Sequence, residues 1–171
     1  MLGTGRVKAA ALPFYELIPF MVVGTKLRIL RHPTLGEYAN AGYAAAPSVI
    51  AAKEDALKRF SRAIVKASLL VRYNPAAAAR ALLAADGKPF GDADLQRKTA
   101  ELTAWEEDLP AADPSSKRIG EISMKGMQAY IQLLADAGST KSVMPAERVV
   151  TERFIEFAND FDRGAFERTV R

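Results

Sequence analysis

The chain opens with a mainly apolar segment that glycine, proline and charged residues divide into three pieces. Residues 7–12 are a short, mostly apolar run between Gly5 and Pro13, which is typical of a buried strand. Residues 14–23 follow that proline and stop at Gly24, a pattern that predicts a helix. Residues 27–30 predict a second strand. Strand, helix and strand in this order predict a parallel α/β unit.

The same segment fits poorly with an export signal or a membrane anchor. Pro13, Glu16 and Pro19 interrupt it, whereas an export signal needs an unbroken apolar stretch and a small-residue cleavage site. A membrane-spanning helix needs about 20 consecutive apolar residues. We therefore expect no signal peptide in this chain. We interpret residues 1–30 as interior elements of a larger sheet, so that the chain is a truncated form of a longer parent protein.

After a polar, turn-rich connection over residues 32–42, the pattern changes from strand-like to helical. Residues 48–51, which follow Pro47, predict a third strand. From residue 53 the apolar residues recur every three or four positions and predict a long helix. Its expected inward face consists of Leu57, Phe60, Ile64, Ala67 and Val71. Lys58, Arg62 and Lys66 form a basic stripe on the other face, which we expect to be a solvated helix surface.

Caps and glycine stops predict further helices along the rest of the chain. Asn74 and Pro75 begin a helix over 76–85 that closes at residues 86–87. Asp94 is expected to cap a helix over 95–107, and Ser116 a long helix over 117–137 that ends at Gly138. Thr151 is expected to cap a last segment, followed by a tail helix over 163–170. The expected inward residues of these helices are Leu95, Leu102, Trp105, Phe154, Ile155, Ala158 and Phe161. We predict an α/β fold that is rich in helices and has few strands.

Composition excludes several kinds of chemistry. The chain has no cysteine, which excludes a disulfide scaffold and a cysteine-ligated metal. Its only histidine is His32, so a histidine-rich zinc site and a Ser-His-Asp triad are not expected. No phosphate-binding loop, dinucleotide fingerprint or metalloprotease motif occurs. The net charge of +4 is too small to indicate a nucleic-acid partner. We expect no enzymatic activity, no metal and no cofactor.

Three motifs, in order along the chain, resemble a known family. Residues 5–13 read GRVKAAALP, residues 60–67 read FSRAIVKA and are followed by NPAAAA at 74–79, and residues 151–162 read TERFIEFANDFD. Together they resemble the C-terminal half of the substrate-binding proteins of ABC transporters, in the group that binds nitrate, taurine, alkanesulfonates or thiamine pyrimidines. Lys8 stands where the family usually has Asp, and Phe14 and Tyr15 stand where an acidic residue and Pro are common.

The resemblance implies part of a type II periplasmic-binding-protein fold. Residues 1–35 would be the last strand-helix-strand of the second lobe, 36–52 the crossover, and 53–171 the helical end of the first lobe. A small solute of the thiamine-pyrimidine, sulfonate, nitrate or aromatic class would bind between the lobes without chemistry. The closed form would then bind an ABC permease, in a periplasmic parent protein. The ligand-binding residues would be Leu12, Pro13, Phe14, Tyr15, Tyr43 and Ser48; for Phe14 and Tyr15, packing as core aromatics is the alternative.

Two other functions are open at this point. The chain could be a helical protein-interaction module that uses the basic stripe and binds no ligand. It could also be a small enzyme, because some members of the family make a thiamine precursor, although no histidine or cysteine cluster supports this. Uncovered sheet edges and apolar surface would favour association with a second copy, so we expect a homo-oligomer, with exchange of the N-terminal segment as one route.

Overall fold

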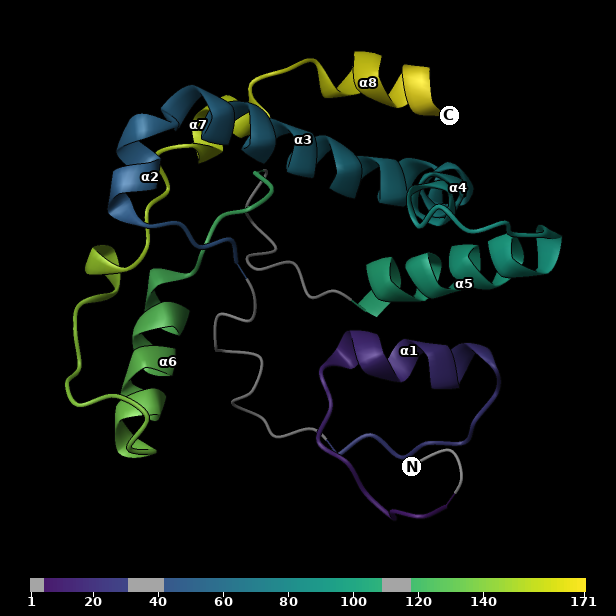
Figure 1. Cartoon of the computed structure of the whole chain (residues 1–171), viewed down its shortest axis with the longest axis horizontal. Helices are drawn as coiled ribbons and strands as arrows, with labels where there is room; N and C mark the ends of the chain where they lie inside the picture. The colour runs from purple at the N-terminus through teal and green to yellow at the C-terminus, as the bar shows by residue number, and fades with distance from the viewer. Residues whose placement is uncertain (1–4, 31–41, 109–117) are drawn as a thin grey trace. The chain divides into compact units, whose positions relative to one another are not determined.

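The computed structural model describes residues 5–30, 42–108 and 118–171, and every regular element in these ranges is helical (Figure 1). The elements are α1 (Phe14–Val22), α2 (Pro47–Ala52), α3 (Glu54–Tyr73), α4 (Pro75–Ala85), α5 (Asp92–Asp108), α6 (Met124–Asp136), the 3-10 turn η3 (Ala146–Arg148), α7 (Ile155–Asn159) and α8 (Arg163–Val170). The predicted α/β fold class is therefore wrong, since the described chain is all-α.

The three predicted strands are absent from the structure, and one reason accounts for all three. Residues 7–12 and 27–30 have no regular structure, and residues 48–51 lie inside α2. A strand needs a neighbouring strand to satisfy its backbone groups, and none is present among the described residues. Around Pro47 the chain satisfies them locally instead, because the amides of Val49 and Ile50 donate to the carbonyl of Ala46 at 2.9 and 3.0 Å.

Local signals place most of the helices correctly. Helix α1 follows Pro13 and ends before Gly24, whose φ of +77° suits glycine. Asn74 caps α4 as predicted, because its side-chain oxygen accepts the amide of Ala77 at 3.0 Å. Helix α8 covers the predicted tail over 163–170, and Gly138 follows the end of α6.

The described residues divide into two compact units, each of which is described by itself. The first unit comprises Met1–Leu30, Ala67–Leu109 and Arg163–Arg171, as far as the structure describes them. The second comprises Arg31–Lys66 and Pro110–Asp162, with the same limit. The predicted boundaries, between residues 35 and 36 and between residues 52 and 53, separate parts of the two lobes of a complete receptor. They stay a prediction.

The first unit is built on the helix pair α4 and α5, with α1 lying beside α5 (Figure 1). Ala78 and Ala79 of α4 pack against Leu102 of α5, and their small side chains let the two helices approach closely. Leu70, Val71 and Leu95 cover this core. Leu95 and Leu102 thus face inward as predicted, but Trp105 does not, because 40% of its surface is exposed.

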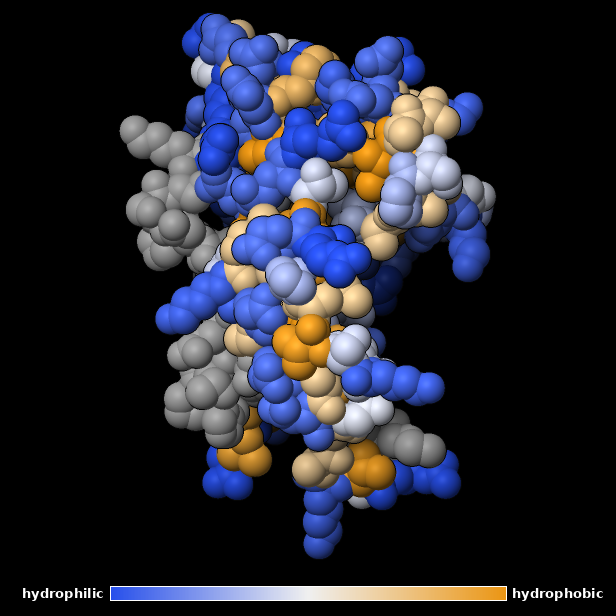
Figure 2. Space-filling model, turned by 90° about the vertical axis from the view of Figure 1, so that its left-hand side faces the viewer, coloured by the Kyte–Doolittle hydropathy of each residue, from blue (hydrophilic) through white to orange (hydrophobic). Residues whose placement is uncertain are grey.

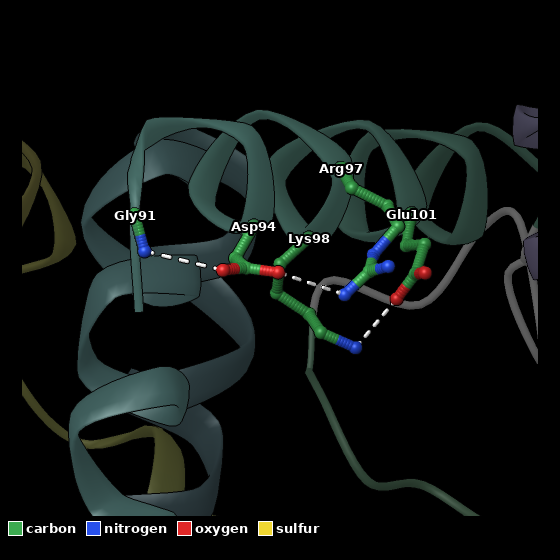
Figure 3. Close-up of polar contacts among 5 residues, drawn as sticks. All are labelled: Gly91, Asp94, Arg97, Lys98 and Glu101. Carbon is green, nitrogen blue, oxygen red and sulfur yellow. Dashed lines mark hydrogen bonds and ion pairs between the residues drawn. The ribbon is translucent and has the colours of Figure 1, made fainter. Parts of the chain in front are cut away.

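Helix α5 begins two residues before the expected cap. Asp94 lies in its first turn, where one carboxylate oxygen accepts the backbone amide of Gly91 at 3.1 Å (Figure 3). An acidic side chain three residues into a helix that reaches back in this way forms half of a capping box. Asp94 therefore stabilises the start of the helix, but from inside it.

The second unit contains α2, the first part of α3, α6, η3 and α7, with Val65, Ile131, Ala146 and Ala158 buried. Helix α6 begins at Met124, later than predicted, and its cap is Ser123, which accepts the amide of Gly126 at 3.0 Å. The expected cap, Ser116, lies outside the described residues. Gly120 has a φ of +93°, which a right-handed helix excludes, so the predicted helix is interrupted at this residue.

The buried face of α3 also differs from the predicted one. Its most buried side chains are Val65 and Leu69, at 3% and 1% exposure. Phe60, expected to face inward, is 44% exposed, and Leu57 and Ile64 are half-buried. The apolar residues of α3 occupy more than one face, and only tertiary packing selects which of these faces is covered.

Candidate functional site

The first four predicted ligand-binding residues lie at the start of α1. The carbonyl of Pro13, the residue just before the helix, accepts the amide of Glu16 at 3.0 Å. Leu12 is half-buried, while Tyr15 is 61% exposed, which argues against packing of Tyr15 as a core aromatic. The side chain of Phe14 lies outside what the structure describes.

The other two predicted ligand-binding residues belong to the second unit. Ser48 is exposed on α2, and the exposed ring of Tyr43 meets the ring of Phe60 edge to face, with ring centres 5.0 Å apart. The six residues are thus divided between the two units: Leu12 to Tyr15 in the first, Tyr43 and Ser48 in the second. The ligand site that combines them stays a prediction.

The basic stripe of α3 is engaged by other parts of the second unit. Arg62 donates from Nε and Nη2 to the backbone carbonyl of Phe157, at 3.0 and 2.6 Å, and its guanidinium lies 3.8 Å from the centre of the Phe157 ring. Lys66 places Nζ 5.1 Å from the centre of the Phe161 ring. Lys58 pairs with Glu54 at 3.0 Å. The prediction of a solvated stripe is wrong for Arg62 and Lys66, which are half-buried.

Asn159 extends these contacts to the segment before α6. Its side chain accepts the amide of Ile119 at 2.9 Å and donates to the carbonyl of the same residue at 3.1 Å. It also donates to the carbonyl of Ile155 at 2.8 Å. We call Arg62, Lys66, Ile119, Phe157, Asn159 and Phe161 the C-terminal clasp, because they join α3, the segment before α6 and the α7 segment.

Sequence reasoning did not find the clasp. Its two aromatic residues and Asn159 belong to the motif at residues 151–162, and Arg62 and Lys66 belong to the motif at 60–67. The spacing of four residues between Arg62 and Lys66, matched by four between Phe157 and Phe161, is a signal that two helical segments could pair. Nothing local, however, indicates that the partner of an exposed-looking arginine is a carbonyl 95 residues away.

A small charged cluster lies at the start of α3. Glu54 pairs with Lys58 and also with Arg153, whose Nη2 lies 2.7 Å from the carboxylate. The hydrogen bond from Lys58 is the largest cause that lowers the pKa of Glu54 below its ordinary value, and the positive charge of Arg153 acts in the same direction. A carboxylate with a lowered pKa stays ionised at neutral pH and is a poor general acid or base.

The charged residues of α5 pair with one another in a similar way (Figure 3). Arg97 reaches Asp94 at 3.1 Å, and Lys98 reaches Glu101 at 2.5 Å. These pairs, three residues apart on one helix, stabilise α5. Within residues 5–30, 42–108 and 118–171, no group of histidine, aspartate and glutamate side chains could hold a metal ion. In the same ranges no helix is both long and apolar enough to span a membrane.

Comparison with protein-family models, with curated proteins and with solved structures gives no match to this chain.

Proposed function

We propose that this chain is the helical part of the solute-binding protein of an ABC importer. The observation that carries the proposal is the C-terminal clasp. Two of the motifs on which the family resemblance depends, at residues 60–67 and 151–162, are far apart in the sequence and bind each other through Arg62 and Phe157. If the resemblance reflects a shared structure, the residues of the motifs are expected to be those that hold the helices together. The contact between the two motifs supports the proposal for this reason.

In this proposal the chain does no chemistry. A small organic solute of the thiamine-pyrimidine, sulfonate, nitrate or aromatic class binds against it, and the remaining parts of the receptor supply the other wall of the cleft. Hinge closure then presents the loaded receptor to the permease. The exposed side chains of Tyr15 and Tyr43 are the first candidates for ligand contact, because their rings can stack on the ring of a thiamine-pyrimidine or aromatic solute.

The test begins with the DNA upstream of the codon for Met1. The proposal expects an in-frame signal peptide and roughly 150 further residues, the size of one lobe. Calorimetric titration then compares this chain with the extended protein, using a thiamine pyrimidine, an alkanesulfonate and nitrate as ligands. We expect binding only by the extended protein, and a loss of about tenfold on Tyr15→Ala, equivalent to about 1.4 kcal/mol. A promoter and ribosome-binding site at Met1, with no receptor sequence upstream, would refute the proposal.

A helical protein-interaction module is the second candidate. It is favoured by the all-helical character of the described residues and by the apolar side chains that reach their surface (Figure 2). The basic stripe is not available as the binding surface of such a module, since Arg62 and Lys66 contact the α7 segment. The module would need another surface, and an authentic gene start at Met1 would favour it.

A further inference from the structure

The N-terminal segment combines exposed apolar side chains with exposed basic ones. Helix α1 lies beside α5 and buries Ile18, while Val23 is 68% exposed and Leu30 74% exposed. Tyr15 and Met21 are exposed as well. These exposed apolar side chains fall within one stretch of sequence, which makes that stretch a candidate interaction site.

The charges of this segment have one predominant sign. Arg6, Lys8, Lys26 and Arg28 are all exposed, with one pair before α1 and the other after it. None of the four forms an ion pair with another described residue. Glu16 is the one acidic residue between positions 5 and 30. Basic residues therefore flank the apolar helix on both sides.

We propose that residues 5–30 bind the surface of an anionic lipid bilayer through the exposed apolar side chains of α1 and of the chain that follows it. The exposed apolar side chains would enter the boundary between headgroups and acyl chains, and the four basic residues would bind lipid phosphates. The segment contains Tyr15, which the proposed function assigns to solute contact, but the membrane proposal does not depend on that function. It concerns attachment to one face of a membrane and not passage through it.

Two other partners fit the same residues less well. A second copy of the chain, related by a two-fold axis, would bring the four basic residues of each protomer towards those of the other, and like charges repel. A nucleic-acid duplex would satisfy the basic residues, but its outer surface is mainly charged and polar and would leave Val23 and Leu30 largely uncovered. An anionic bilayer satisfies both features at once.

The experiment is sedimentation of the full chain with lipid vesicles. One set contains phosphatidylcholine alone, and in the other about a third of the lipid is phosphatidylglycerol. We expect binding to the anionic vesicles that weakens at high salt, and much weaker binding to the neutral ones. Binding that is equal on both vesicles, or absent on both, would overturn the proposal.

Two pairs of variants test the residues. The double variant Lys26→Gln/Arg28→Gln should bind anionic vesicles roughly 25-fold more weakly, since each basic residue near such a surface contributes about fivefold. Val23→Ser should lose roughly tenfold through its apolar contact. The matched control Lys88→Gln/Lys141→Gln removes two exposed lysines outside the segment and should bind like the unmodified chain. An equal loss in the control would show that only net charge matters, and no loss in either test variant would show that the segment does not contact the bilayer. Either result would also overturn the proposal. So would binding to double-stranded DNA that is tighter than binding to the anionic vesicles and equally sensitive to Val23→Ser.

Discussion

Replacing Arg62 tests whether the C-terminal clasp holds the second unit together. Arg62→Ala removes both hydrogen bonds to the carbonyl of Phe157 and the contact with its ring. The carbonyl is left half-buried and without this partner. Among the basic residues of α3, Arg62 is the one whose two donors converge on a single backbone atom. Its loss should therefore destabilise α7 as well as α3.

The size of the effect follows from these contacts. A hydrogen-bonding interaction with a charged donor contributes about 1.5–3 kcal/mol, and a cation–π contact at a partly exposed site adds about 0.5–1 kcal/mol. Because Arg62 is half-exposed, we expect the lower end of the sum, about 2 kcal/mol. With a urea m-value of about 2 kcal/mol/M, the midpoint of unfolding should fall by about 1 M.

The assay is urea unfolding followed by circular dichroism, with two matched variants. Arg59→Ala removes an exposed arginine on the same helix and should change the free energy of unfolding by less than about 0.5 kcal/mol. Phe157→Leu keeps the carbonyl that Arg62 binds but removes the ring, so it should cost less than Arg62→Ala. Hydrogen exchange should show loss of protection in α7 for Arg62→Ala.

Equal midpoints for Arg62→Ala and Arg59→Ala would refute this reasoning, because the clasp would then contribute nothing beyond a surface charge. If Phe157→Leu lowers the free energy of unfolding as much as Arg62→Ala does, the stabilisation comes from the contact with the ring and not from the hydrogen bonds to the carbonyl.

Three further predictions concern single residues. Gly120→Ala should destabilise the chain by about 1–2 kcal/mol in thermal unfolding, because φ is +93° and the new Cβ would lie 3.2 Å from Ile155; an unchanged midpoint would contradict this. Asn74→Ala should cost about 1 kcal/mol, and Asn74→Ser less, because serine keeps a cap acceptor and loses only the bond to the end of α8; equal costs would show that the cap is not the main contribution. The lowered pKa of Glu54, due first to its hydrogen bond with Lys58, contributes stability above about pH 4.5 that is lost as the pH falls through the folded pKa, so Glu54→Gln should flatten this part of a stability–pH curve. If the unmodified chain and Glu54→Gln lose stability identically at acidic pH, the pairing of Glu54 with Lys58 does not contribute to stability.

Local sequence determined several helix ends, although α5 and α6 begin elsewhere than predicted and α7 begins at Ile155, after Phe154 and not after the predicted cap Thr151. Asn74 with Pro75, and the glycines at 24, 87 and 138, mark helix ends correctly, because a cap or a left-handed residue acts within a few positions along the chain. Helices satisfy their backbone groups internally, so their prediction needs no knowledge of distant residues.

Tertiary structure decided what depends on a partner. The apolar runs at 7–12, 27–30 and 48–51 carry a strand-like pattern, but a strand exists only beside another strand, and the described residues supply none. The covered face of α3 was likewise settled by packing that buries Val65 and Leu69. The partner of Arg62 is a carbonyl in α7, and no spacing rule connects residues so far apart in sequence. Hydrogen bonds between distant segments, and the faces that these segments bury, depend on the fold of the whole chain. The local sequence pattern therefore does not predict them.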